Sequence, residues 1–276
     1  MSPIVIILAL GLVQGLCEFL PVSSSGHLVL AQAFLGLKGP EILLDLVLHA
    51  GTLLAVFIFY RQSLASLVAE LRFLPGAVLT WKVGKVCRER PDFKLGALIV
   101  AGSVPTAIIG LFAQTRLEAL FGSVTAVGVA LLITATVLFL TKLKKTPGSR
   151  SIELMTIFDA ILIGTAQGLA IAPGLSRSGL TIVCALALGL TRELSAKYSF
   201  LLSIPAIMGG LLLTVKQGQA SSLGNGYLFL GLLTSALVGY FSLRFLTYVV
   251  DKGRLALFAP WCLAAGLLAL LSPLFR

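Results

Sequence analysis

The chain has 276 residues, of which 58% are hydrophobic and only 12% are charged. Its mean hydropathy is +1.03, whereas a soluble globular domain carries about 25% charged residues. So few charges cannot cover a water-facing surface, which excludes a soluble enzyme, a disordered protein and a nucleic-acid-binding domain. The formal net charge of +10 then indicates basic loops beside an anionic bilayer. The composition predicts an all-α polytopic membrane protein.

The apolar segments, taken in chain order, give six spans and two broken regions. A spanning helix needs about 20 mostly apolar residues. A region interrupted by proline and followed by serines and glycine predicts a re-entrant helix–loop–helix, which enters and leaves the membrane on one side. The expected order is a hairpin at 3–37, a span at 42–60, a basic loop at 61–94, spans at 95–113 and 123–141, a second hairpin at 157–190, and spans at 198–215, 226–243 and 255–275.

The two broken regions are copies of each other at an offset of 153 residues. This offset aligns Gln14 with Gln167 and Ser23 with Ser176. We therefore expect a single membrane domain, 1–276, made of repeat one at 1–141 and repeat two at 153–276. Each repeat contains one hairpin and three spans, and an odd number of spans inverts the second copy relative to the first.

Basic residues give an orientation. If the loop 61–94 lies in the cytoplasm, most of the 21 lysines and arginines fall on that side of the membrane. The first hairpin then opens to the outside and the second to the cytoplasm. Whether the loop 61–94 holds a short amphipathic helix at the membrane surface stays open.

The first half of hairpin one carries an unusual acidic residue. Gln14 and Glu18 are four residues apart and share one helix face. A carboxylate at lipid depth costs about 2.5–3.5 kcal/mol or more and by default faces a cavity. We interpret Glu18 as a general base or metal ligand; the alternative is a structural hydrogen bond between the repeats.

Both hairpin loops carry polar residues at a helix start. In the first, five polar or small residues follow Pro21: Ser23, Ser24, Ser25, Gly26 and His27. In the second, residues of the same kind surround one arginine: Gly174, Ser176, Arg177, Ser178 and Thr181. Hydroxyls and N–H groups at a helix N-terminus bind anions, and a guanidinium grips phosphate oxygens with two parallel hydrogen bonds.

The repeat alignment divides the chemistry between the halves. Glu18 aligns with Ile171, Ser24 with Arg177, and His27 with Leu180. One half therefore supplies a carboxylate, a serine and an imidazole, while the other supplies the guanidinium. A single composite site at the repeat interface explains this division, and it suits a phosphate or diphosphate with a lipid tail in the bilayer.

These motifs resemble those of the undecaprenyl-diphosphate phosphatases of the bacitracin-resistance type. The stretch 14–27 is similar to the family pattern (E/Q)-x-x-x-E followed by P-V-S-S-x-G-H. The stretch 173–181 matches P-G-x-S-R-S-x-x-T at every fixed position, and the segment 45–52 also looks familial. Length, number of spans and the inverted repeat agree, so the resemblance covers essentially the whole chain.

The resemblance implies hydrolysis of undecaprenyl diphosphate to the monophosphate and inorganic phosphate in the bacterial plasma (inner) membrane. This reaction recycles the lipid carrier of peptidoglycan synthesis and gives resistance to bacitracin, which sequesters the diphosphate. The resemblance also implies a divalent cation, Mg²⁺ or Ca²⁺. Gln14 stands where many family members have glutamate, so the acidic role and the metal fall to Glu18.

We assign roles accordingly. Four residues are expected to be catalytic: Glu18, Ser24 as nucleophile, His27 as general acid or base, and Arg177 on the diphosphate. Seven are expected to bind substrate: Gln14, Ser23, Ser25, Gly174, Ser176, Ser178 and Thr181. Asp45 and His49, four residues apart in the span 42–60, either support the site or form a packing hydrogen bond.

Several alternatives stay open at this point. Water could attack the diphosphate directly, with Ser24 only binding phosphate, and Ser23 or Ser25 could replace Ser24 as nucleophile. A lipid-phosphate flippase or anion carrier would also show inverted repeats and broken helices, although it has little need of His27 beside the serines. The oligomeric state, including a homo-oligomer, and the membrane face of cleavage are also undetermined.

Overall fold

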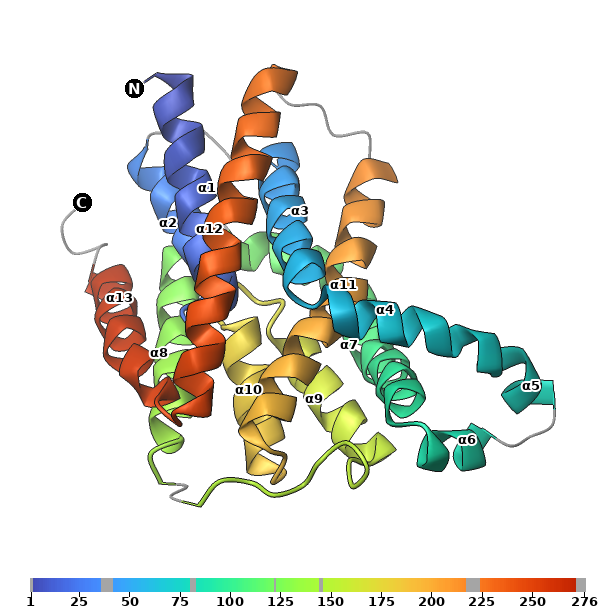
Figure 1. Cartoon of the computed structure of the whole chain (residues 1–276). Helices are drawn as coiled ribbons and strands as arrows, with labels where there is room; N and C mark the ends of the chain where they lie inside the picture. The colour runs from blue at the N-terminus through green and yellow to red at the C-terminus, as the bar shows by residue number, and fades with distance from the viewer. Residues whose placement is uncertain are drawn as a thin grey trace.

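The computed structural model describes residues 2–35, 42–79, 83–121, 123–143, 146–216 and 224–271. Throughout these ranges the ordered elements are helices, with one isolated bridge between Arg150 and Leu190, which confirms the all-α class (Figure 1). The elements are α1 (Pro3–Phe19), α2 (Ser24–Phe34), α3 (Ile42–Phe59), α4 (Arg61–Glu70), η1 (Leu71–Phe73), α5 (Leu74–Leu79), α6 (Val83–Glu89), α7 (Pro91–Phe121), α8 (Val124–Leu140), α9 (Ile157–Leu169), α10 (Arg177–Ala187), α11 (Arg192–Lys216), α12 (Asn225–Asp251), η2 (Leu255–Phe258) and α13 (Ala259–Leu271).

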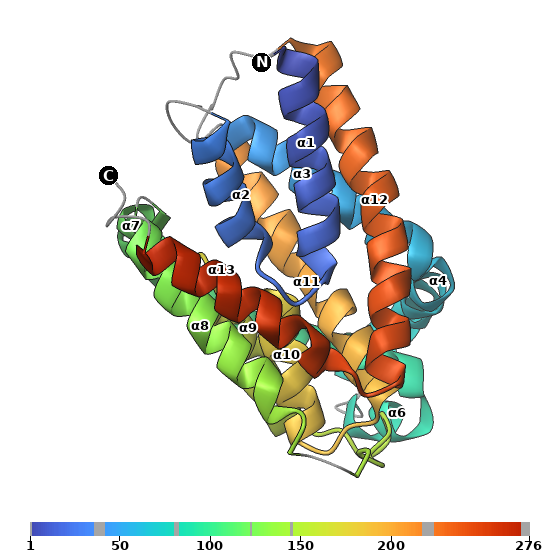
Figure 2. The ribbon, with the colours of Figure 1, turned by 90° about the vertical axis from the view of Figure 1, so that its left-hand side faces the viewer.

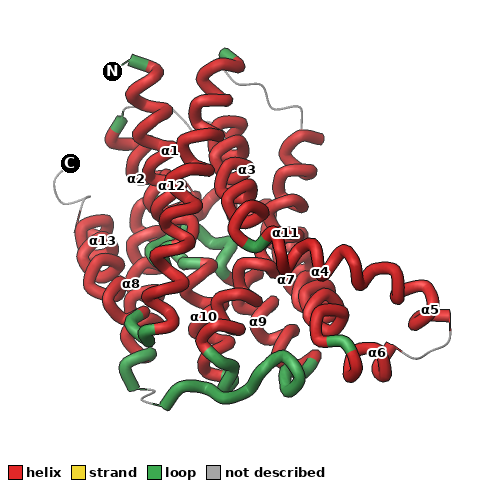
Figure 3. Tube along the Cα trace, viewed as in Figure 1, coloured by secondary structure: helices red, strands yellow, loops and turns green. Residues whose placement is uncertain are grey.

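Both broken regions are helical hairpins, as the sequence predicts. In the first, α1 ends before Pro21, Ser23 adopts a positive φ of 72°, and its hydroxyl accepts the N–H of Gly26 to cap α2. In the second, α9 begins with a capping box between Thr156 and Asp159, and Ser176 caps α10. The two hairpins come from opposite ends of the bundle, and their loops lie near its middle (Figure 3).

The spans are less uniform than the sequence suggests. Among the described residues, three helices are long and apolar enough to cross a membrane: Pro91–Phe112, Arg192–Leu213 and Asn225–Asp251. A fourth is counted if α3 and the helices after it form one bent span, since they meet at 79°. With 17 residues each, α8 and Leu255–Leu271 stand at the short end of the spanning range. The predicted span 255–275 continues past the described residues.

The basic loop predicted at 61–94 is mostly helical, and α7 already begins at Pro91. We call the elements α4, η1, α5 and α6 the arm, which projects sideways from the bundle (Figure 1). Arg90 secures it by bonding Glu70 at 3.0 Å and covering the Phe73 ring at 3.6 Å. No residue of α4 is buried, and the arm exposes apolar side chains at Val68, Leu71 and Leu74.

Long helices hold the hairpins in place. In the packing, α1 lies along α12, α9 lies along α7, and α8 pairs with α13 (Figure 2). Gly102 and Gly164 bring α7 and α9 into backbone contact, because a Cβ on Gly164 would overlap the Gly102 carbonyl. On α8, Thr134 donates to the carbonyl of Gly174 at 3.0 Å and accepts the N–H of Ser176 at 3.1 Å. The loop of hairpin two is thereby fastened to α8.

Candidate active site

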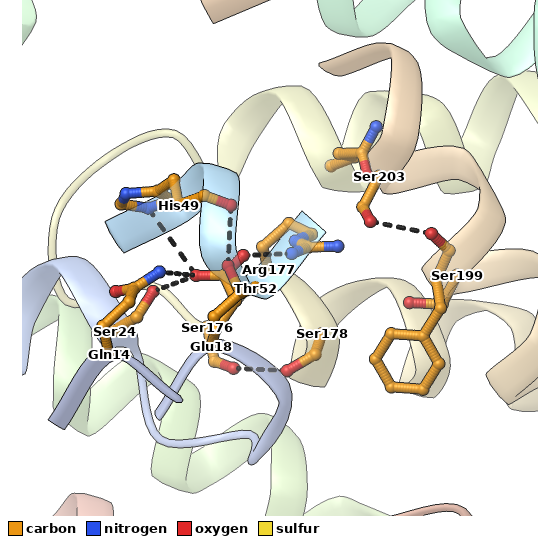
Figure 4. A network of polar contacts seen from close by, with 12 residues as sticks. Gln14, Glu18, Ser24, His49, Thr52, Ser176, Arg177, Ser178, Ser199 and Ser203 are labelled. Carbon is orange, nitrogen blue, oxygen red and sulfur yellow. Dashed lines mark hydrogen bonds and ion pairs between the residues drawn. The ribbon is translucent and has the colours of Figure 1, made fainter. Parts of the chain in front are cut away.

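Glu18 is the centre of a polar network between the two hairpins (Figure 4). It lies near the end of α1 and is only 7% exposed. Its Oε2 accepts hydrogen bonds from Gln14 Nε2 at 3.0 Å and Ser24 Oγ at 2.7 Å, and His49 Nε2 lies 3.6 Å away. Its Oε1 accepts from the guanidinium of Arg177. Four side chains from three helices and the start of α10 therefore meet at one carboxylate.

Arg177 is the contribution of the second hairpin. It is the first residue of α10, directly after the cap Ser176, so the helix start positions it in the middle of the protein. Nη2 bonds Glu18, whereas Nη1 is buried and has no hydrogen-bond partner among the described residues. A buried, charged donor without an acceptor is unfavourable, and a phosphate oxygen would satisfy it.

Ser24 is the one loop serine whose hydroxyl donates to the carboxylate. At 2.7 Å the contact is a strong, charge-assisted hydrogen bond, and Ser24 is only half-buried. The acceptor oxygen thus lies where it can take the hydroxyl proton. This is the geometry of a nucleophile beside a general base.

Ser23 joins the two hairpins through hydrogen bonds. It is 2% exposed, and its Oγ accepts the N–H of Gly26 at 3.2 Å and the N–H of Gly174 at 3.1 Å. Gly174 has φ of +94°, and a Cβ there would lie 2.5 Å from the Val127 carbonyl. Ser25 lies beside Ser23, with their hydroxyls 3.5 Å apart. Ser23 and Gly174 therefore hold the two hairpin loops together.

The predicted binding residues of hairpin two are also engaged in packing. Ser176 and Ser178 are each 1% exposed, and their hydroxyl oxygens are 3.3 Å apart. Thr181 is fully buried, donates to the carbonyl of Arg177 at 2.7 Å and contacts Ser199 Oγ on α11 at 2.5 Å. These hydroxyls hold the start of α10 in place, which positions Arg177.

His27 lies outside the network around Glu18, although it contacts one of the loop serines. Its Nδ1 is 2.8 Å from the carbonyl of Ser23, and its Nε2 accepts the indole N–H of Trp261 at 2.9 Å. No hydrogen bond or ion pair joins His27 to Glu18, Ser24 or Arg177 in the described part of the chain. The reason is geometric: the ring folds back along α2 toward its own helix start and meets α13 on the other side.

His49, not His27, faces the carboxylate. Its Nδ1 is 2.7 Å from the carbonyl of Asp45, which directs Nε2 toward Glu18, and its side chain is 31% exposed. The carboxylate of Asp45 in turn accepts from Gln32 at 2.7 Å. The sequence showed a histidine and an aspartate inside a span, but it did not show whether they support the site or only form a packing hydrogen bond. The structure places His49 beside Glu18.

A divalent cation has a partial set of ligands here. The amide oxygen of Gln14 is buried and lacks a hydrogen-bond partner among the described residues, and the nitrogen of the same amide donates to Glu18. The described ranges contain no group of three or more His, Cys, Asp or Glu side chains that could hold a metal ion by themselves. Mg²⁺ usually binds through one or two carboxylates, waters and substrate phosphates. The residues therefore fit a cation that the diphosphate itself helps to hold.

Comparison with known proteins agrees with the motifs. A family model described as bacitracin resistance protein BacA matches residues 7–268. A relative from Desulforapulum autotrophicum, called undecaprenyl-diphosphatase, is 43% identical over 95% of this chain and 96% of its own length. Relatives of the same name from Carboxydothermus hydrogenoformans and Korarchaeum cryptofilum are 42% and 43% identical, over 95% and 96% of this chain and 95% and 97% of their own.

Proposed function

The chain belongs to the family of the bacitracin resistance protein BacA, and we propose that it hydrolyses undecaprenyl diphosphate to undecaprenyl phosphate and inorganic phosphate. The relatives called undecaprenyl-diphosphatase are similar to this chain over nearly their full length. Its apolar helices make it a multi-pass membrane protein. The reaction regenerates the lipid carrier of peptidoglycan synthesis. It also removes the diphosphate that bacitracin sequesters, which confers resistance. The site of action is the plasma (inner) membrane.

One observation supports the mechanism above the others. The hydroxyl of Ser24 donates to Glu18 at 2.7 Å, and the same carboxylate holds Arg177, whose Nη1 lacks a partner among the described residues. A nucleophile, a proton acceptor and a phosphate-binding cation are therefore within one network. Such an arrangement supports phosphoryl transfer, which depends on positioning and electrostatic stabilisation.

The proposed reaction has two steps. Ser24 Oγ forms a bond to the terminal phosphorus, its proton passes to Glu18, and the bond from that phosphorus to the bridging oxygen breaks, releasing undecaprenyl phosphate. After Glu18 has released this proton to solvent, water attacks the phosphoserine and gives a proton to Glu18. The Ser24–phosphorus bond breaks, Glu18 returns the proton to Ser24 Oγ, and inorganic phosphate leaves. Arg177 and the starts of α2 and α10 offset the charge of the transferred group.

We assign the cation to Glu18 and the amide oxygen of Gln14, with the diphosphate oxygens as further ligands. Mg²⁺ or Ca²⁺ suits oxygen ligands of this kind. When bound, the cation neutralises part of the diphosphate charge. Because Gln14 is neutral, this site holds one carboxylate, and we expect weaker cation binding than a site with two would show.

We also propose that residues 1–141 and 153–276 are inverted repeats. The element order supports this, because each half contains a hairpin followed by three further apolar helices, if the arm is set aside. The packing supports it too: α1 lies on α12 of the other half, and α9 lies on α7 of the other half. Glu18 and Arg177 then come from equivalent hairpins.

The test is phosphate release from a long-chain polyprenyl diphosphate by the purified protein in detergent. Wild type with Mg²⁺ or Ca²⁺ is compared with the chelated protein, Glu18→Gln, Ser24→Ala and Arg177→Met. We expect release by wild type and its loss in each variant and on chelation. A well-folded wild type that releases no phosphate with either cation would contradict hydrolysis, and lipid translocation would then be measured.

The serine mechanism has a separate test. A stalled reaction should accumulate a phosphoenzyme that is absent from Ser24→Ala, and Ser25→Ala is the matched control that should still form it. If Ser24→Ala retains more than about a tenth of wild-type turnover, direct attack by water replaces Ser24 as the first step.

A further inference from the structure

Trp261 contacts the histidine that the motif makes prominent. It lies on α13, on the same side of the molecule as α2 (Figures 1 and 2). Its indole Nε1 donates to His27 Nε2 at 2.9 Å, and the two rings are nearly coplanar, with centroids 6.1 Å apart and planes 14° apart. The contact joins residues 234 positions apart. Nothing in the sequence motifs points to it.

Hydrogen-bonding rules fix the state of His27 in this structure. An indole nitrogen is a donor only, so Nε2 must accept and carries no proton. A backbone carbonyl is an acceptor only, so Nδ1, which lies 2.8 Å from the carbonyl of Ser23, must carry the proton. The imidazole is therefore neutral, and both nitrogens are in use. Any proton that His27 takes up must go to Nε2, which requires the bond to Trp261 to break.

Of the two bonds, the one to Trp261 is the easier to release. The Ser23 carbonyl belongs to the start of the same helix, four residues before His27, and Ser23 is 2% exposed. Trp261 is 60% exposed and can turn into the lipid without loss of core packing. The two partners of His27 are thus one fixed anchor and one movable contact.

We propose that Trp261 is a positioning residue that holds His27 in a resting state, and that the bound diphosphate replaces its indole N–H at His27 Nε2. The inference rests on the proposed function, since it names the lipid diphosphate as the replacing ligand. An ionised phosphate oxygen only accepts, so this exchange requires that Nε2 take up a proton from solvent. Substrate binding then changes His27 from an acceptor there to a donor.

The first test uses the wild-type protein and needs no activity. The chain has two histidines, so ¹⁵N-histidine labelling gives two imidazoles, and His49→Gln assigns them. We expect His27 to have a protonated Nδ1 and an unprotonated Nε2 when free. Saturation with a non-hydrolysable methylene-diphosphonate lipid should give a protonated Nε2. A free protein with the proton on Nε2, or an unchanged spectrum at saturation, would overturn the proposal.

The second test removes only the N–H group, through Trp261→Phe. The substrate no longer competes with the indole, so the analogue should bind about 2- to 10-fold more tightly, the factor for one neutral hydrogen bond. Turnover at saturation should stay within about twofold of wild type. Phe241→Leu, which alters another exposed aromatic side chain (59%), is the control and should leave binding unchanged.

The outcomes separate this inference from the proposed function. Unchanged or weaker binding by Trp261→Phe, with wild-type phosphate release intact, would refute the role of Trp261 alone. A wild type that binds the analogue and shifts His27 but releases no phosphate would refute hydrolysis and leave the exchange standing.

Discussion

Removal of the Arg177 side-chain charge should destabilise the protein as well as inactivate it. Glu18 and Arg177 have side chains only 5% and 15% exposed. Loss of one partner of such a pair leaves a buried charge without compensation, which costs about 3–5 kcal/mol. In Arg177→Met, the carboxylate keeps only the neutral donors Gln14 and Ser24 and a histidine at 3.6 Å. We therefore expect a loss of stability in the upper part of that range.

The double variant Glu18→Gln/Arg177→Met tests the cause. Both charges are then absent, so it should be more stable than Arg177→Met alone by about 2–3 kcal/mol, the upper part of the coupling that contacting residues show. Thermal unfolding in detergent measures each variant, with the exposed Arg244→Met as the control for loss of an arginine. Additive effects, or an Arg177→Met protein as stable as wild type, would refute the argument that the pair is buried and coupled.

Gly174→Ala should lower the free energy of unfolding by about 1–3 kcal/mol, because the φ of Gly174 is +94° and its Cβ would overlap α8. The control is Gly209→Ala, which has open space around its Cβ. Equal melting temperatures of the two variants would contradict this. His49→Ala should lower phosphate release at least about tenfold, because His49 faces Glu18. The melting temperature should not change, because the side chain is 31% exposed. Unchanged release would show that His49 does not contribute to the site. A fluorophore at Leu71→Cys should be quenched by nitroxide lipids more strongly than one at Gln62→Cys, because we expect the exposed apolar side chains of the arm to enter the bilayer. Equal quenching would place the arm in water.

The helical hairpins could be predicted because their signals are local. A proline ends one half-helix, a serine caps the next, and the offset of 153 residues shows that the pattern occurs twice. The division of charge between Glu18 and Arg177 followed from the same alignment, and the structure brings the two side chains together. These features depend on residues close in sequence or equivalent between repeats.

The contacts of the two histidines could not be predicted in the same way. His27 is one turn after Ser24, but its ring folds back to Ser23 and meets Trp261 from a distant helix. His49 reaches Glu18 because α3 packs beside α1. Each position depends on how helices far apart in sequence are rotated against one another. A single sequence without its fold contains no local signal for that rotation.

The Glu18–Arg177 pair gives a physical reason for splitting the site between two hairpins. A buried ion pair gains little over apolar packing, because both charges lose their hydration. Here Arg177 uses one side of its guanidinium on Glu18, and Nη1 has no hydrogen-bond partner within the described ranges. An anion that reaches Nη1 satisfies that donor. It binds a guanidinium that is already largely removed from water. Since Glu18 and Arg177 come from separate hairpins, a small relative shift of the two loops changes the distance between base and cation. Ser23 also bonds Gly174 across the loops, so the two hairpins are joined both at the ion pair and at this hydrogen bond.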